Sequence, residues 1–221
     1  MYSKIENYML ECMNDGAHDC LHVYRVLYSC LELAKDYDAD TDVLIAAALL
    51  HDIGREAQFR NPDFDHAVIG ADMAFDFLQT IGWIEDNANR VKECILTHRF
   101  RSANPPITIE AKILFDADNL DTTGTVGIAR TLACGGIISR PLYSIDEQGN
   151  VIDCKNDKKE SFFREYNFKL KNVYDKFYTK RAEQIAESRR KAGVGFYENM
   201  YKEVCSTHQN GIKLMKNAIQ Q

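Results

Sequence analysis

Apolar residues recur at spacings of three and four along most of the chain, which is typical of amphipathic helices. The run from Val43 to Leu50 is apolar nearly all round and predicts a central buried helix. We expect helices at about 3–13, 19–37, 42–53, 65–81, 85–98, 108–119 and 124–134. Two more follow from about Phe162, the second rich in Arg and Lys between Lys180 and Lys191. The pattern predicts an all-α fold.

Residues of about 136–160 break this helical pattern. Pro141, several glycines and a polar run from Lys155 to Glu160 predict an irregular insertion. Within it, the segments 142–145 and 151–152 are expected to pair as a small hairpin. With 221 residues the chain can bury one good core, so we expect a single domain over 1–221.

Composition is that of an ordinary soluble globular protein, with 45% hydrophobic and 27% charged residues. The net charge of −6 argues against nucleic-acid binding, because phosphate contacts need a basic surface. It leaves room for a local basic pocket that binds a small phosphorylated ligand. No signal peptide is visible, and no apolar run approaches the ~18 residues of a membrane span.

The seven cysteines are odd in number and none forms a Cys-x-x-Cys pair. Both a thiolate zinc site and a disulfide framework are therefore disfavoured. We expect free thiols in a cytoplasmic protein without a membrane partner. A homodimer stays open.

The pair His51-Asp52 stands at the end of the buried apolar run, where an ionised side chain is unusual. A buried Asp is rarely tolerated unless it is paired or bound to a metal. Imidazole nitrogen and carboxylate oxygen together suit a divalent cation. The pair therefore indicates a metal site.

Four further residues with the same chemistry lie near expected helix ends or on apolar faces: His22, His66, His98 and Asp118. Each has a simple structural explanation, because His complements a helix C-terminus and Asp bonds its local backbone. Together, however, these explanations leave unrelated polar residues on several mostly apolar helices. One metal centre accounts for all of them. His18, four residues before His22, would share its helix face.

The ordered set His22, His51-Asp52 and Asp118 resembles the His, His-Asp, Asp motif of the HD superfamily of metal-dependent phosphohydrolases. The surrounding stretches 18–26, 47–54 and 110–121 are also similar to the family's motif helices, and the last resembles a bacterial subgroup of HD-domain hydrolases. A late motif of that subgroup is similar to the positions Thr179, Ala182, Ile185, Ala186 and Arg189. The resemblance covers most of residues 15–205, and leaves out the 136–160 insertion and the C-terminal tail.

The resemblance implies a compact helical bundle around a central metal site. His22, His51, Asp52 and Asp118 would hold a divalent cation, and His66 and His98 stand where some members bind a second. One ion and two ions both stay open, and the ligand types do not distinguish Mn, Mg, Fe, Co, Ni and Zn.

Such a site implies metal-dependent hydrolysis of a phosphate monoester or diester of a small, nucleotide-like molecule. A divalent ion lowers the pKa of bound water and takes up charge on phosphoryl oxygens. Asp52 would also orient the attacking water, and His18 or His66 would protonate the departing oxygen.

Cations near the motifs are candidates for phosphate binding: Arg25, Arg55, Lys112 and Arg130. Surface Lys and Arg are commonly just solvated. Arg25 and Arg130 have a second alternative, which is an internal ion pair with Asp19 or Asp121.

One position departs from the family pattern. Some members carry a catalytic acidic residue three positions after the motif Asp, where this chain has Arg55. Glu56 is the next residue, which on a helix is rotated by about 100° around the axis from Arg55. The acidic role is therefore not transferred to this chain.

Two other functions stay open. Some HD relatives use the six-residue ligand set for oxidative cleavage, so a di-iron oxygenase is an alternative to the hydrolase. The other is a catalytically silent sensor that keeps the metal and a ligand. The insertion and the helix with Arg181, Arg189 and Arg190 are expected to cover the metal cleft and select the substrate.

Overall fold

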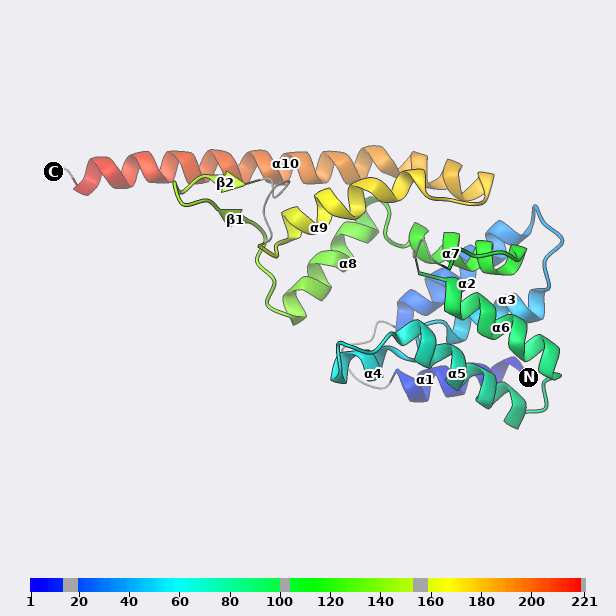
Figure 1. Ribbon diagram of the computed structural model, residues 1–221. Coiled ribbons are helices and arrows are strands. Elements are labelled where there is room, and N and C mark those ends of the chain that lie inside the picture. The colour runs from blue at the N-terminus through cyan, green and yellow to red at the C-terminus, as the bar shows by residue number, and fades with distance from the viewer. Residues whose placement is uncertain (14–19, 100–103, 153–158, 220–221) are drawn as a thin grey trace. The chain divides into compact units, whose positions relative to one another are not determined.

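The computed structural model describes residues 1–13, 20–99, 104–152 and 159–219 (Figure 1). Helices form nearly all the regular structure in these ranges, beside one two-stranded sheet, so the predicted all-α fold is confirmed. The chain falls into two compact units. The first comprises Met1–Asp121 with Phe177–Glu183, and the second Thr122–Lys176 with Gln184–Gln221. A single domain over the whole chain stays a prediction.

The first unit is a helical bundle around α3 (Thr41–Leu50), which packs against each of the other long helices of this unit. Those helices are α1 (Tyr2–Cys12), α2 (Cys20–Ala34), α5 (His66–Thr80), α6 (Glu85–Thr97) and α7 (Ile109–Leu120). Every residue of α3 from Val43 to Leu50 is buried, apart from the half-buried Ile45. Asp40 begins the helix, because its carboxylate accepts hydrogen bonds from the backbone N–H groups of Asp42 and Val43.

Helix α3 ends at Leu50, three residues before the predicted end at 53. The chain tightens there into turns, in which Ile53 N–H donates to the Leu50 carbonyl and Arg55 N–H to the Asp52 carbonyl. A short helix that the sequence pattern did not predict, α4 (Arg55–Arg60), follows at once. The turn presents His51 and Asp52 side by side at the end of the buried helix.

Gly54 allows this turn to pass close to α5. A Cβ atom on Gly54 would lie 2.3 Å from the His66 carbonyl oxygen and 2.7 Å from the Gly70 nitrogen. Real Cβ atoms essentially never approach so closely. The glycine therefore brings the His51-Asp52 turn against the first residue of α5, His66.

The end of α7 is tied to residues 177–183. Asp116 is fully buried, and its carboxylate accepts hydrogen bonds from the backbone N–H groups of Tyr178 and Thr179 and from the Thr179 hydroxyl. These contacts explain the structural use of Thr179 in the late motif: it anchors the start of a long helix to the helix that carries Asp118.

The second unit has its own helices and sheet. They are α8 (Gly124–Ile137), β1 (Ser144–Ile145), β2 (Val151–Ile152), α9 (Phe162–Phe168), the 3₁₀ helix η1 (Leu170–Asp175) and most of α10 (Lys180–Ile219). The two strands are antiparallel, with Ser144 opposite Ile152 and Ile145 opposite Val151. The small hairpin is therefore present within the predicted insertion, and α8 runs three residues beyond its predicted end at 134.

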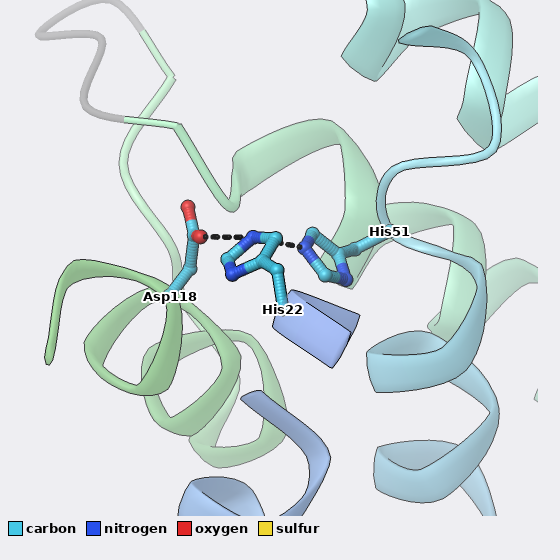
Figure 2. Close-up of side chains that lie close together, drawn as sticks. All are labelled: His22, His51 and Asp118. Atoms are coloured by element: carbon cyan, nitrogen blue, oxygen red, sulfur yellow. Dashed lines mark hydrogen bonds and ion pairs between the residues drawn. The ribbon is translucent and has the colours of Figure 1, made fainter. Parts of the chain in front are cut away.

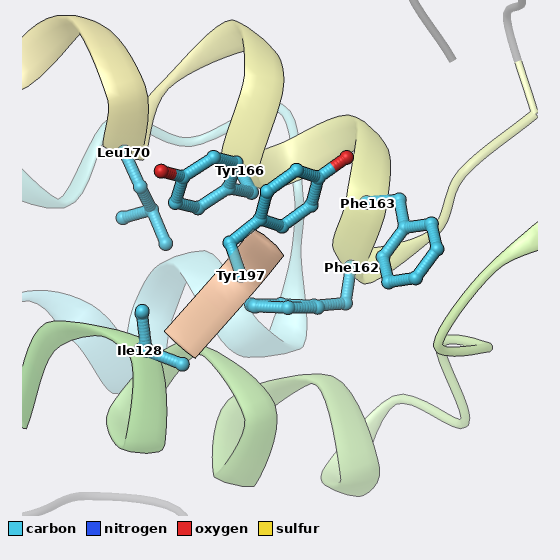
Figure 3. Packing of buried hydrophobic residues seen from close by; sticks show 6 residues of the cluster. All are labelled: Ile128, Phe162, Phe163, Tyr166, Leu170 and Tyr197. Carbon is cyan, nitrogen blue, oxygen red and sulfur yellow. The ribbon is translucent and has the colours of Figure 1, made fainter. Parts of the chain in front are cut away.

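An aromatic cluster holds the second unit together (Figure 3). The rings of Tyr166 and Tyr197 stack with centroids 3.8 Å apart and an interplanar angle of 6°. Tyr143, Val151 and Ile152 from the hairpin region pack against the same cluster. The insertion thus contributes to the hydrophobic core of this unit, as far as its residues are described.

Within the described ranges, none of the helices combines the length and the apolar character that crossing a membrane requires. The cysteines of these ranges are free thiols: Cys12, Cys20, Cys30, Cys94, Cys134 and Cys205.

Candidate metal centre

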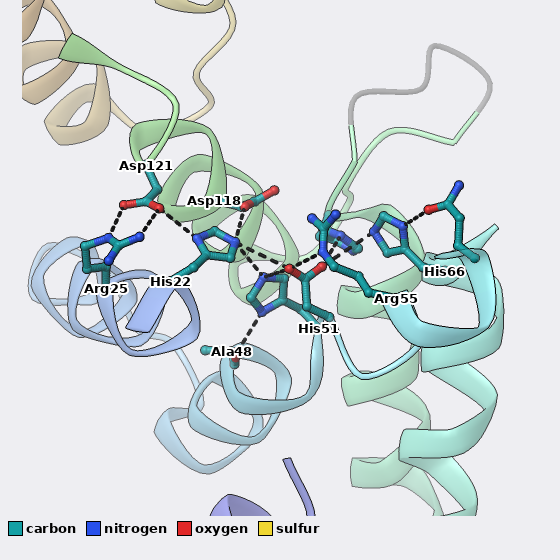
Figure 4. A network of polar contacts seen from close by, with 11 residues as sticks. His22, Arg25, Ala48, His51, Arg55, His66, Asp118 and Asp121 are labelled. Carbon is teal, nitrogen blue, oxygen red and sulfur yellow. Dashed lines mark hydrogen bonds and ion pairs between the residues drawn. The ribbon is translucent and has the colours of Figure 1, made fainter. Parts of the chain in front are cut away.

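Six side chains from five places in the first unit converge on one buried point (Figure 4). His22 lies on α2, His51 and Asp52 on the turn after α3, and His66 begins α5. His98 follows the last residue of α6, and Asp118 lies on α7. The Asp118 side chain is 18% exposed, and each of the other five side chains is at most 3% exposed. The ligand candidates of the motif thus meet in space.

The six residues form two groups of three. Ligand atoms of His22, His51 and Asp118 lie within 4.8 Å of one another, as do those of Asp52, His66 and His98. Figure 2 shows the first group, in which the His22 ring lies between the Asp118 carboxylate and the His51 ring. His22 Nε2 is 3.2 Å from Asp118 Oδ1 and 3.4 Å from His51 Nε2.

Asp52 connects the two groups through its two carboxylate oxygens. Its Oδ2 atom lies 3.5 Å from Nε2 of His22 and 3.5 Å from Nε2 of His51. Its Oδ1 atom lies 3.5 Å from Nε2 of His66 and 3.8 Å from Nε2 of His98. One carboxylate therefore faces both groups, as a ligand shared by two cations would.

The Nδ1 atom of each histidine is hydrogen-bonded to an acceptor outside the centre. His51 donates to the Ala48 carbonyl at 2.8 Å and His98 to the Ile95 carbonyl at 2.6 Å. His66 donates to the side-chain oxygen of Gln58, and His22 to Asp121 Oδ2 at 2.7 Å. In its neutral form each imidazole therefore carries its proton on Nδ1, which leaves the Nε2 lone pair directed at the centre, where a metal ion would bind.

Several polar atoms at the centre are buried with no hydrogen-bond partner among the described residues. They are both carboxylate oxygens of Asp52 and the Nε2 atoms of His66 and His98. Arg55 Nε lies 2.5 Å from Asp52 Oδ2, an ion-pair contact without hydrogen-bond geometry. Unsatisfied buried polar atoms are costly and rare. The donor set therefore fits a bound divalent cation, which would satisfy these atoms together.

Burial also sets the protonation of the second group. Burial, with the charge of Arg55, lowers the pKa of His66 to about 3. Burial, with the neighbouring His51, lowers the pKa of His98 to about 4. Both imidazoles are then neutral near pH 7, which is the form that binds metals.

The carboxylates and His22 are shifted by one another. Burial by itself would raise the pKa of Asp52 and Asp118, but Arg55 and His51 beside Asp52, and His22 beside Asp118, hold both below their usual range. Burial would likewise lower the pKa of His22, but Asp118, Asp121 and Asp52 raise it to about 10. Without a metal, His22 therefore carries a second proton near pH 7, which a cation bound at this group would displace.

The predicted phosphate-binding cations differ in their positions. Arg55 begins α4 and contacts Asp52 directly, whereas Arg25 pairs with Asp121 through Nε at 2.8 Å. Lys112 is half-buried on α7, six residues before Asp118, and thus about 9 Å along the helix axis.

Arg130 is half-buried on α8, in the second unit. Glu56, the nearest acidic residue after the motif, pairs with Arg60 on the same short helix. His18 lies outside the described residues.

Two residues that support the centre were not assigned to it from the sequence. Asp121 is the C-cap residue of α7, in helical conformation three residues after Asp118, so the two lie on one face, and this spacing was an available signal. Gln58 lies in a segment with no helical pattern, and only the fold brings it to His66.

Comparisons with known proteins place these residues in a family. The family model of the HD domain matches residues 21–123, a stretch that contains all six residues of the centre. The uncharacterized protein YpgQ of Bacillus subtilis (strain 168) is 30% identical over 193 residues, which cover 86% of this chain and 85% of that protein.

Solved structures show the same relationship. Bacillus subtilis YpgQ in complex with ADP matches with a TM-score of 0.69 and 26% identity, over 91% of this chain and 94% of that one. A predicted HD superfamily hydrolase from an uncultured Thermotogales bacterium matches with a TM-score of 0.61 and 29% identity, over 91% of each chain. An HD-superfamily hydrolase from Bacillus thuringiensis matches with a TM-score of 0.68 and 26% identity, over 91% of this chain and 95% of that one. From its motifs, its fold and these relatives, the chain belongs to the HD superfamily.

Proposed function

We propose that the protein is a metal-dependent phosphohydrolase that cleaves a phosphate monoester or diester of a small, nucleotide-like molecule. The observation that carries the proposal is the convergence of two three-residue groups on the two oxygens of Asp52. His22, His51, Asp118 and Asp52 would hold one divalent cation, and Asp52, His66 and His98 a second. Four imidazoles with two carboxylates favour a transition-metal ion over Mg²⁺.

The cation supplies Lewis-acid activation of water and stabilises charge on the phosphoryl oxygens. The chain's residues supply the orientation. Asp52 is held by its neighbours in the ionised form, so it can accept a hydrogen bond from a water molecule at the centre and align it. Asp118, the partly exposed member, marks the side on which the centre reaches solvent.

Arg55 is the cation best placed to receive a phosphate. Its side chain is 40% exposed while its Nε atom contacts Asp52, so the guanidinium spans the distance from the buried carboxylate to solvent. Arg is suited to phosphate because its planar fork forms paired, charge-assisted hydrogen bonds. The low pKa of His66 leaves no proton on its Nε2 near pH 7, which favours a ligand over a proton donor.

The nucleotide-like substrate class has separate support. A structure of the Bacillus subtilis relative exists in complex with ADP. The acidic chain as a whole is unsuited to long nucleic acids, and the contact of Arg55 with the centre suits a small phosphate. A nucleoside phosphate therefore fits both observations.

The test is a hydrolysis panel with purified protein and each of Mn²⁺, Co²⁺, Ni²⁺, Zn²⁺ and Mg²⁺. The substrates are nucleoside mono-, di- and triphosphates, p-nitrophenyl phosphate and bis-p-nitrophenyl phosphate. We expect metal-dependent release of phosphate or of the nucleoside, abolished in Asp52→Ala and retained in Asp86→Asn, a change at an exposed carboxylate of α6. Metal binding without turnover of any substrate would contradict a hydrolase and support a silent sensor.

The second group of ligands also favours one further candidate, a di-iron oxygenase. His66 and His98 beside Asp52 complete a six-residue set that can hold two iron ions. Protein loaded with Fe²⁺ would then consume oxygen in the presence of substrate and give a Mössbauer signal of coupled iron. Hydrolysis that is equally fast without oxygen contradicts this alternative.

A further inference from the structure

We propose that Asp121 is a positioning residue of the metal centre, which holds His22 toward the cation, and that Arg25 serves the centre by holding Asp121. The inference rests on the proposed function in that it takes the centre to bind a cation. It assigns Arg25 a role in support of the centre instead of a role in phosphate binding.

The contacts form a continuous chain from Arg25 to the centre (Figure 4). Arg25 Nε donates to Asp121 Oδ1 at 2.8 Å, and Arg25 Nη2 donates to Asp121 Oδ2 at 3.1 Å. Asp121 Oδ2 accepts from His22 Nδ1 at 2.7 Å, and His22 Nε2 faces Asp52 and Asp118. The guanidinium thus fixes a carboxylate, which fixes an imidazole.

Helix α7 and its C-cap residue, Asp121, supply both ends of this support. Asp118 contributes a candidate ligand oxygen, and Asp121, three residues later, contributes the acceptor for His22. Residues three apart lie on one helix face, so one rigid element sets both distances to His22. The ring of His22 is therefore held between the carboxylate of Asp118 on α7 and the carboxylate of the C-cap residue of that helix.

His22 differs from the other three imidazoles in the charge of its acceptor. The others donate Nδ1–H to neutral oxygens, namely the Ala48 and Ile95 carbonyls and the Gln58 amide. An anionic acceptor makes an imidazole a stronger metal ligand than a neutral acceptor does. His22 should therefore contribute more to cation affinity than its position alone suggests.

Arg25 offsets the cost of burying the Asp121 carboxylate. The Asp121 side chain is 7% exposed and lies near two further carboxylates, Asp52 and Asp118, across the His22 ring. A buried charge is costly unless it is paired and hydrogen-bonded. The two-point contact with Arg25 provides both, and it fixes the plane of the carboxylate that His22 meets.

The same helix offers a matched control. Glu110 near the start of α7 is paired with Arg90, and the exposed fractions of the two side chains, 7% and 35%, equal those of Asp121 and Arg25. Glu110 accepts from the Asp40 N–H and from Arg90, and it touches no histidine in the described contacts. Its loss removes a comparable ion pair but not the support of His22.

The experiment compares Asp121→Ala with Glu110→Ala by competition for Mn²⁺ or Zn²⁺ with a chromophoric chelator. We expect Asp121→Ala to weaken cation binding by about 10- to 100-fold, the usual effect of removing a carboxylate behind a metal-bound histidine. Glu110→Ala should change it by less than about twofold. Should the alanine variant fail to fold, Asp121→Asn keeps the size and is expected to weaken binding by about tenfold, because it removes the charge.

A second measurement does not need a metal. In the NMR spectrum of metal-free protein, the Nδ1–H proton of His22 should be protected from exchange and shifted downfield. That signal should disappear in Asp121→Ala and persist in Glu110→Ala. Unchanged cation affinity in both Asp121 variants, or an unchanged His22 signal in Asp121→Ala, would overturn the inference. If the wild-type protein binds no cation, that result overturns the proposed function instead. The NMR comparison still tests the contact between His22 and Asp121.

Discussion

Replacement of Gly54 by alanine should damage both the stability of the first unit and the second group of ligands. The added Cβ would lie 2.3 Å from the His66 carbonyl oxygen and 2.7 Å from the Gly70 nitrogen, where 3.0–3.4 Å is already tight. Both neighbours are backbone atoms, so no side chain can move aside. The start of α5 would have to retreat by about 0.7–1.1 Å from the turn that carries Asp52.

Overpacking of this kind costs about 1–3 kcal/mol. The Nε2 atom of His66 lies 3.5 Å from Asp52 Oδ1. The retreat would move His66 by more than the distance from a metal ion to its ligand can vary. Urea unfolding should report the lower free energy of unfolding. Equilibrium dialysis with elemental analysis should report a loss of cation at the second group.

Gly195→Ala provides the control for the same substitution. Gly195 lies inside α10, and a Cβ there meets nothing within 4 Å. Alanine at that position should stabilise the protein by roughly 0.5–1 kcal/mol, because glycine is a poor helix former. The reasoning about close approach is refuted if Gly54→Ala leaves both the free energy of unfolding and the bound metal unchanged.

Three further predictions concern the ligands, pH and substrate. His66→Ala and His98→Ala should each lower the number of bound cations from two to one per chain, as measured by elemental analysis. An unchanged number of cations per chain would exclude the second group as a metal site. Burial raises the pKa of Asp116 from 3.8 to about 6, so the folded chain holds this proton more tightly than the unfolded chain does. The contribution of Asp116 to the free energy of unfolding should therefore fall by up to about 3 kcal/mol as the pH rises from 4 to 6. The difference between wild-type and Asp116→Asn protein isolates this contribution, because the opposite contributions of His66 and His98 are common to both proteins. A difference that does not change with pH would contradict the assignment. Arg55→Ala should raise the KM for a nucleotide by about 10-fold or more, because it removes a charge-assisted contact with phosphate. Glu56→Gln should leave the KM within about twofold, and equal effects of the two substitutions would contradict a phosphate role for Arg55.

The helices of the first unit were predictable because their burial follows the apolar spacing along the sequence. The pattern around Val43 to Leu50 indicated the central helix, and a resemblance of ordered motifs indicated which His and Asp residues meet. The turn at residues 51–54 was not predictable in this way, because the close approach of Gly54 to α5 depends on a residue distant in sequence.

The supports of the ligands were harder to predict than the ligands themselves. Arg25 and Asp121 were recognisable as a possible ion pair, but not as a support for His22, because that contact joins residues 99 positions apart. Gln58 carries no signal of its own, since the sequence pattern does not predict α4 and only the fold brings this side chain to His66. Hydrogen bonds between distant segments follow from the packing of helices and not from helical periodicity.

Elemental analysis of protein purified without added metal tests the central claim most directly. The six side chains of the centre should retain at least one divalent transition-metal ion per chain. A His22→Ala, Asp118→Ala double variant with wild-type helix content should lose the ion at the first group. Wild-type protein that holds no ion, even after dialysis against Mn²⁺, Fe²⁺, Co²⁺, Ni²⁺ and Zn²⁺, would contradict the claim.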